Sequence, residues 1–246
     1  MKDNEDCRIA AIVLTAGSSS RMRGIKKEYH KLANGITILE SSVKSFFRAP
    51  SIKRIVIAVT AGEENIAREA IAGGLLTSAE NSNDNAREPE IIFVNGGNER
   101  RASVFNALSV LLPYNPRYVL IHDGARPYIS VSLIENIISA VKKRGAVIPL
   151  LALTDTPKET GIWNSQSDEQ KEVFIKRHLK RANVGTAQTP QAFKFPEIYY
   201  AHKKAAAVNE EFTDDAEIWG RFRGKVAAIE GDPANKKITF AEDLDL

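Results

Sequence analysis

Short apolar runs alternate with segments of helical periodicity along the first half of the chain. In the segments between the runs, apolar residues recur every three or four positions, which is typical of amphipathic helices. Strand followed by helix, repeated, predicts right-handed crossovers and an α/β fold with a mostly parallel twisted sheet covered by helices on both faces. The expected strands are 9–14, 55–59, 91–94, 118–121 and 146–153, and the expected helices are 39–47, 104–112 and 132–144. Pro149 should end or bend the fifth strand early.

The alternation breaks near residue 153. Residues 154–186 are polar and contain one short alternating piece, VFIK at 173–176. We interpret this segment as an arm subdomain of β structure that leaves a single domain spanning 1–246, with a free linker as the alternative. Residues 77–89 are expected to form a solvated loop, and 225–229 are expected to form a further strand.

Polar loops follow four of the predicted strands. They read TAGSSSRM, NGGNERRASV, HDGARP and TDTPKE in chain order. Because the carboxyl ends of parallel strands meet at one edge of a sheet, these loops should converge, and ligands of such sheets bind there. The sequence therefore predicts a binding site built from these loops.

The first loop offers an anion site. Its small residues leave backbone N–H groups accessible, and Arg21 and Lys27 add positive charge, so phosphate is the expected ligand. The loop lacks both the G-x-G-x-x-G dinucleotide fingerprint and the GK[ST] of a Walker loop. A surface turn with incidental cations is the alternative.

HDGARP places Asp123 and Arg126 three positions apart at a strand end. Arginine can bind a phosphate or carboxylate through two N–H groups. Aspartate can accept hydrogen bonds from sugar hydroxyls or help to hold a hydrated metal ion. The two side chains could instead pair with each other. His122 is expected to be a packed histidine and not a base.

Composition narrows the classes of function. Lys and Arg total 34 against 31 Asp and Glu, a formal net charge of +3, which does not favour a nucleic-acid partner. The single cysteine, Cys7, allows no intrachain disulfide, and the His and Cys residues show no metal-ligand spacing. No apolar run approaches the roughly 20 residues of a membrane span, and the N-terminus is acidic. We therefore expect a cytoplasmic protein without a membrane partner and without metal-ligating side chains.

The motifs resemble, in order, those of the 2-C-methyl-D-erythritol 4-phosphate cytidylyltransferase family. The resemblance runs from about residue 9 to 244 and is carried by AGSSSRM, KEY, GGNERRASV, HDGARP, DTPK, TAQTPQAF and NKKITFAEDL. It implies a Rossmann-like nucleotidyltransferase fold whose extended arm clasps a second subunit in a homodimer. It also implies transfer of a cytidylyl group from CTP to the alcohol phosphate with release of pyrophosphate, using Mg²⁺ bound mainly through the CTP phosphates.

The resemblance also assigns roles to residues. Arg21 and Lys27 match two cations beside the triphosphate, and Lys237 matches a lysine at the α-phosphate. Arg181 matches an arm arginine that holds the substrate phosphate across the dimer interface, and Thr156 matches a similar contact. Asp123, Arg126 and Thr189 match the alcohol-phosphate site, and Ala16, Gly17, Gly97, Asn98 and Ser103 match the cradle of the cytidine triphosphate.

The assigned cations have a physical purpose. A phosphate that attacks an α-phosphorus surrounded by anionic oxygens is repelled by several kcal/mol at about 4 Å with an effective dielectric constant of about 20. Cations around the α-phosphate remove that repulsion.

The sequence departs from the family at Ser19, where glycine is usual, and at Lys26 and Glu28, where proline and glutamine are usual. Two adjacent lysines, Lys236 and Lys237, leave open which one reaches the phosphate. The rival hypotheses are a ribitol 5-phosphate cytidylyltransferase and a nucleotide-binding module without turnover. An NAD-dependent oxidoreductase lacks its glycine fingerprint here.

Overall fold

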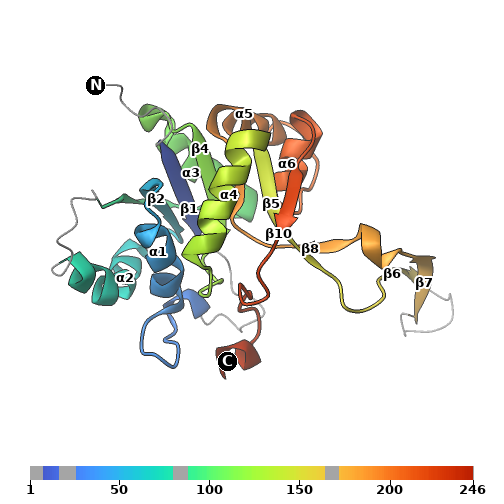
Figure 1. The fold of residues 1–246 in the computed structure, drawn as a ribbon, viewed down its shortest axis with the longest axis horizontal. Coiled ribbons are helices and arrows are strands. Elements are labelled where there is room, and N and C mark those ends of the chain that lie inside the picture. Colours follow the sequence, from blue (N-terminus) through green and yellow to red (C-terminus); the bar gives the residue numbers. More distant parts are fainter. Residues whose placement is uncertain (1–7, 17–25, 80–87, 164–171, 246) are drawn as a thin grey trace.

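The computed structural model describes residues 8–16, 26–79, 88–163 and 172–245. An eight-stranded sheet forms its centre, with the strand order β10-β5-β9-β4-β1-β2-β3 and β8 paired to β5 (Figure 1). The strands β1, β2, β3 and β4 are mutually parallel, β10 is parallel to β5, and β9 runs antiparallel between β4 and β5. Their bounds are β1 (Ile9–Leu14), β2 (Ile52–Val59), β3 (Glu90–Asn95), β4 (Tyr118–Asp123), β5 (Ala146–Ala152), β8 (Gly185–Ala187), β9 (Gln191–Lys194) and β10 (Ala227–Glu230).

Helices cover both faces of the sheet, which confirms the predicted fold class. Alternate side chains of β1 point to opposite faces, as the strand period requires. Ile9, Ala11 and Val13 pack in one core with α1, α2 and α4, whereas Ala10 and Ile12 pack in the other with α3, α5 and α6. The helices are α1 (Ile38–Arg48), α2 (Glu64–Ala79), α3 (Arg100–Val110), α4 (Val131–Arg144), α5 (Phe195–Ala205) and α6 (Asp215–Phe222).

Three of these helices have a short polar residue as their N-cap. Thr37 accepts a hydrogen bond from Glu40 N at α1, Ser130 from Leu133 N at α4, and Asp214 from Glu217 N at α6. Each cap satisfies one of the backbone N–H groups that a helix start leaves without a partner. The third cap directs the next residue, Asp215, into the protein, where it is fully buried.

Several expected boundaries were wrong, and β2, for example, begins at Ile52 and not at residue 55. The strand with Pro149 does not end early, because Pro149 lies between the residues that pair with β9 and those that pair with β8, where a missing N–H is tolerated. Helix α2 extends to Ala79, so the first part of the expected loop 77–89 is helical, and 80–87 lie outside the described residues. Helix α3 begins at Arg100, earlier than its apolar periodicity indicated, because its first turn is polar.

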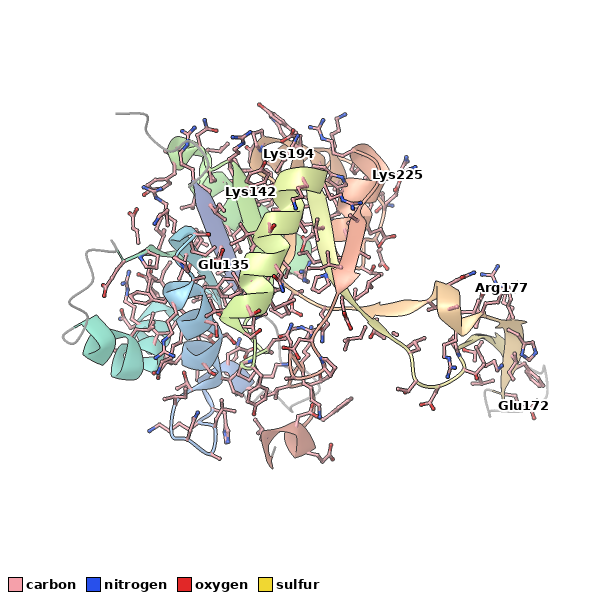
Figure 2. All side chains as sticks on the ribbon, viewed as in Figure 1. Glu135, Lys142, Glu172, Arg177, Lys194 and Lys225 are labelled. Carbon is pink, nitrogen blue, oxygen red and sulfur yellow. The ribbon has the colours of Figure 1, made fainter. Side chains whose placement is uncertain are left out.

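An arm projects from the body between β5 and β8 (Figure 1). It contains the antiparallel pair β6 (Lys158–Trp163) and β7 (Glu172–His178) and a 3-10 turn, η5 (Arg181–Asn183). The chain rejoins the sheet at Gly185, where β8 pairs with β5. Figure 2 shows Glu172 and Arg177 on this arm, well away from Glu135 and Lys142 on α4.

Among the described helices, none has both the length and the apolar character that crossing a bilayer would need.

Candidate active site

The last residue of β4, Asp123, lies at the centre of a cluster of cations. Its Oδ2 is 2.8 Å from Lys237 Nζ and 3.7 Å from Arg126 Nε, and its Oδ1 is 3.7 Å from Arg100 Nε. The Asp123 side chain is only 13% exposed, so these charges act where water screens them weakly. The expected alternative, in which Asp123 and Arg126 simply pair, is incomplete because two further cations share the carboxylate.

The charge balance keeps Asp123 ionised. Burial by itself would raise the pKa of this carboxyl, but Lys237 and then Arg100 and Arg126 hold the pKa far below its usual range. Three cations therefore face the Asp123 carboxylate, although Arg100 also pairs with Asp215. The positive charge that remains suits phosphate ligands.

The C-terminal segment that carries Lys237 is tied to the core by buried hydrogen bonds. Asn235 donates from Nδ2 to Thr189 O at 2.8 Å, and its own carbonyl accepts from Arg126 Nη1 at 2.8 Å. Gln188 Nε2 donates to the Asn235 carbonyl as well, and Ile238 N donates to Ala125 O. This clamp determines where the segment passes the end of β4.

The two adjacent lysines differ in their surroundings. Lys237 Nζ lies 2.8 Å from Asp123 Oδ2. Lys236 lies near Asp243, whose pKa is lowered by hydrogen bonds from the backbone of Phe240 and Thr239 and, to a smaller extent, by the charges of Lys236 and Lys27. Lys27, in the 3-10 turn η3 (Lys27–Tyr29), donates from Nζ to Ile238 O at 2.8 Å. Two predicted cations, Lys27 and Lys237, thus meet at one short segment.

The two neighbours of Lys27, at which the sequence departs from the family, both contact the body of the protein or lie within it. Lys26 Nζ donates to Thr60 at 2.8 Å and lies 3.5 Å from Glu63. Glu28 is only 4% exposed, and burial raises the pKa of its carboxyl even though Lys27 and Lys26 oppose the shift. Glu28 is therefore a residue of the interior and not a surface charge beside Lys27.

His122 is a packed histidine, as expected. Its Nε2 lies 3.3 Å from the Arg126 carbonyl, which can only accept, so Nε2 carries the proton. Its Nδ1 then accepts from the Thr189 hydroxyl at 3.0 Å, while that hydroxyl oxygen accepts from Asp123 N. Burial first, and the charge of Arg126 in addition, lower the pKa of the imidazole to about 4. A neutral His122 positions Thr189 beside Asp123.

The loop after β3 comes within contact distance of the loop after β1. A Cβ on Gly96 would lie 2.3 Å from Ala16 Cβ and 2.9 Å from Ser103 Oγ, so only glycine permits this approach. Gly97 N donates to Ser103 Oγ at 3.0 Å, and Asn98 is exposed. Four of the residues expected to cradle a nucleotide, Ala16, Gly97, Asn98 and Ser103, therefore gather at the carboxyl ends of β1 and β3.

The structure does not bring all predicted residues together. Arg181 lies on the arm, where it donates to Thr154 O at 2.5 Å, and Thr156 is exposed on the same arm. Within one chain the arm points away from the body that holds Asp123 (Figure 1). Gly17 and Arg21 lie outside the described residues.

Sequence reasoning missed Arg100, Asp215 and His202. Arg100 was visible only as one of two adjacent arginines in NGGNERRASV, and nothing in the sequence indicated which one faces the site. Its neighbour Arg101 turns away, donating to Ala205 O and pairing with Glu99. No sequence motif pointed to Asp215 or His202, because they lie on different helices and meet only when α5 and α6 pack together.

The described residues contain no group of three or more His, Cys, Asp or Glu side chains that could hold a metal ion. Asp123, the carboxylate at the centre of the site, is already surrounded by cations.

A mostly parallel α/β sheet with polar loops and cations beyond its strand ends has the arrangement that α/β proteins use to bind phosphate-bearing ligands. The chain matches the 2-C-methyl-D-erythritol 4-phosphate cytidylyltransferase family over residues 9–246, and it belongs to that family. It is 35% identical over 241 residues to the bifunctional enzyme IspD/IspF of Bartonella tribocorum, covering 96% of this chain and 54% of the relative. It is also 35% identical over 238 residues to the same-named enzyme of a Bradyrhizobium species, covering 96% and 55%. The chain thus spans about half the length of the curated relatives it matches.

Solved structures support the same family. A 4-diphosphocytidyl-2C-methyl-D-erythritol synthase from Anaerococcus prevotii superposes with a TM-score of 0.78 at 29% identity, covering 98% of this chain and 94% of the other. The 2-C-methyl-D-erythritol 4-phosphate cytidylyltransferase of Francisella tularensis superposes with a TM-score of 0.72 at 26% identity, covering 97% of each chain.

Proposed function

We propose that this chain transfers the cytidylyl group of CTP to 2-C-methyl-D-erythritol 4-phosphate, forming 4-CDP-2-C-methyl-D-erythritol and pyrophosphate. A phosphate oxygen of the alcohol phosphate forms a bond to the α-phosphorus of CTP. The bond between that phosphorus and the oxygen bridging to the β-phosphate breaks, and pyrophosphate leaves. Family membership and the cationic cluster at the end of β4 support this assignment.

The observation that carries the proposal is the meeting of Lys27, Lys237 and Asp123. Lys27 holds the carbonyl of Ile238, and Lys237 extends from the residue before it to Asp123. Lys27, from η3, and Lys237, from the C-terminal segment, are therefore both anchored at that segment where it passes the end of β4. There they would neutralise charge that gathers around the α-phosphorus, and their fixed position means that little reorganisation accompanies the reaction.

The remaining groups divide into two subsites. Ala16, Gly97, Asn98 and Ser103 would hold the nucleotide through backbone and small polar groups. Asp123, Arg126 and Thr189 would bind the alcohol phosphate. Gly17 and Arg21, which lie outside the described residues, are assigned to the nucleotide side by family resemblance.

The arm supports a homodimer in which each site is shared. Every described residue of β7 is exposed, including Val173 at 66% and Ile175 at 55%, and an isolated two-stranded sheet is marginal in water. Arg181 and Thr156 on the arm have no role in the site of their own chain. We therefore assign both to the alcohol phosphate bound by a second copy of this chain.

Mg²⁺ is proposed to enter with CTP. The site fits this arrangement because its own carboxylate, Asp123, is occupied by cations, while the triphosphate supplies oxygen ligands. When bound, the ion would neutralise the departing pyrophosphate. A cytoplasmic location is proposed as well, because the single cysteine, Cys7, allows no intrachain disulfide, which fits a reducing compartment.

The experiment that tests the function is pyrophosphate release with CTP, Mg²⁺ and either 2-C-methyl-D-erythritol 4-phosphate or ribitol 5-phosphate. We expect release with the first alcohol phosphate alone. Release with ribitol 5-phosphate alone would instead indicate a ribitol 5-phosphate cytidylyltransferase. CTP binding without release in either case would favour a nucleotide-binding module.

Substitutions of the adjacent residues Lys236 and Lys237 form a matched pair that tests whether the reaction takes place at this site. Lys237→Ala should reduce kcat by about a hundredfold or more, as loss of a preorganised charge does in comparable sites. The adjacent Lys236→Ala should retain kcat within about twofold, because that side chain acts on Asp243 and not on Asp123. Equal effects of the two substitutions would contradict the assignment.

A further inference from the structure

Arg100, Asp215 and His202 form a chain of polar contacts that leads from Asp123 into the interior of the protein. Arg100 Nη2 lies 2.7 Å from Asp215 Oδ2, and His202 Nε2 lies 3.1 Å from Asp215 Oδ1. Asp215 and His202 have no exposed side-chain surface, whereas Arg100 is one-third exposed on the side of the site. The guanidinium thus has one nitrogen anchored in the interior and another, Nε, directed at Asp123 Oδ1 at 3.7 Å.

The arrangement divides the two oxygens of Asp123 between different partners. Oδ1 faces Arg100, whereas Oδ2 faces Lys237 at 2.8 Å and Arg126 at 3.7 Å. A carboxylate without the first contact could rotate and offer both oxygens to Lys237 and Arg126. Those two cations would then be held more tightly by the protein and less available to a phosphate ligand.

A contribution to the stability of the fold does not by itself explain why Arg100, Asp215 and His202 contact one another. Burying a carboxylate such as Asp215 costs free energy that its ion pair only partly recovers, so a buried pair is weak grounds for a purely stabilising role. Asp215 remains ionised all the same: burial would raise its pKa, but Arg100 and His202 lower it to about 2. A fixed Arg100 instead orients the Asp123 carboxylate, which faces the site.

We propose that Arg100 is a positioning residue, which Asp215 and His202 hold from behind so that it fixes the orientation of the Asp123 carboxylate in the alcohol-phosphate subsite. The inference rests on the proposed function only for the identity of the ligand. It assigns a role to the first residue of α3, which follows the loop of Gly97 and Asn98 and pairs with Asp123 in the alcohol-phosphate subsite. Arg100 itself contacts Asp123 and is not required to touch the reacting atoms.

Kinetics of Arg100→Gln and Asp215→Asn test this role. We expect each to raise KM for the alcohol phosphate by about tenfold, the loss typical of one charge-assisted contact, with KM for CTP changed less than about twofold. Arg100→Lys should fall between wild type and Arg100→Gln, because one ammonium cannot reach both carboxylates as the guanidinium does. The double variant should equal Arg100→Gln, since both substitutions break the same chain.

Arg101→Gln is the matched control. Arg101 is the next residue of α3 but binds Glu99 and Ala205 O, so both KM values should stay near wild type. An unchanged KM for the alcohol phosphate in Arg100→Gln would overturn the proposal. An equal rise in both KM values, or an equal effect of Arg101→Gln, would also overturn it, because each would indicate a general structural defect.

A crystal structure of Arg100→Gln separates this inference from the proposed function. We expect the fold to persist, because Arg100 is partly exposed, and the Asp123 carboxylate to rotate toward Lys237 and Arg126. An unrotated carboxylate would overturn the inference whatever the enzyme's substrate. If the wild-type protein shows no turnover, the proposed function is contradicted. The orientation of the Asp123 carboxylate in the crystal structure would then still test this inference.

Discussion

Lys27 Nζ lies 2.8 Å from the Ile238 carbonyl, although 211 positions separate the two residues in the chain. The contact ties the loop after β1 to the C-terminal segment that carries Lys237. Lys27 and Lys237 therefore come from opposite ends of the sequence, and this hydrogen bond and the clamp around Asn235 bring them to one place.

Lys27→Ala should fold but lose most turnover. The substitution removes one charge from the site and frees Ile238, so we expect kcat to fall by about a hundredfold, with a smaller change in melting temperature. Steady-state pyrophosphate release and thermal melting measure the two effects. Lys31→Ala, an exposed lysine just after the same turn, is the control and should keep kcat. A Lys27→Ala enzyme with normal kcat would remove Lys27 from the charge-stabilising set.

Activity should reappear when two inactive variants are mixed. Arg181→Ala and Lys27→Ala lie on different sides of the proposed shared site, so a mixed dimer has one site with both groups intact. Random reassociation should restore about one quarter of wild-type activity, because half the dimers are mixed and each has one working site. Activity that stays at the level of the separate variants would place Arg181 outside the partner's site.

The exposed strand β7 should carry the dimer. Replacing Val173 and Ile175 with serine removes apolar area that the monomer leaves in water, so we expect a shift from dimer to monomer in light scattering. The same two substitutions should lower turnover together with dimerisation. Lys176→Ser, in the same strand and 70% exposed at its side chain, is the control and should leave the dimer intact. A monomeric wild type, or an active monomer, would contradict the shared site.

Stability should fall between neutral pH and pH 4 because of His122. Its pKa is lowered from 6.5 to about 4 in the folded protein, so the unfolded chain binds more protons between these values. Lowering the pH through this window therefore favours unfolding, by roughly 3 kcal/mol for a shift of this size, with no further loss from His122 below pH 4. Urea unfolding at several pH values measures the slope. His122→Gln should flatten it, whereas His178→Gln on the exposed arm should not.

Gly96→Ala should weaken CTP binding. The added methyl would meet Ala16 and Ser103, two cradle residues, at distances no real contact has, so the two loops must separate. We expect KM for CTP to rise by about tenfold and stability to fall by about 1–3 kcal/mol, the usual cost of overpacking. Gly220→Ala is the control, because its new methyl meets nothing and alanine favours a helix. A normal KM for CTP in Gly96→Ala would show that the cradle lies elsewhere.

Much of the candidate site could be predicted from short stretches of sequence. The loop HDGARP follows a strand in the sequence and lies at a strand end in the structure, because an apolar run of that length must be buried in the sheet. Asp123, Arg126 and Lys237 were named from loops and motifs and do meet. Arg181 and Thr156 were also named, but a single chain leaves them on the arm.

Hydrophobic periodicity was enough to predict the alternation of strands and helices, and hence a mostly parallel sheet, because it records which side of each element is buried. The different surroundings of Arg100 and Arg101, and of Lys236 and Lys237, depend on how distant segments pack. In each pair the charge and the chain position are nearly identical. What separates them is the rotation of α3 against the sheet and the path imposed by the clamp at Asn235, and both depend on packing between segments more than 100 residues apart. The pairing of Asp215 with His202 and Arg100 has the same origin, since α3, α5 and α6 meet only when they pack on one face of the sheet.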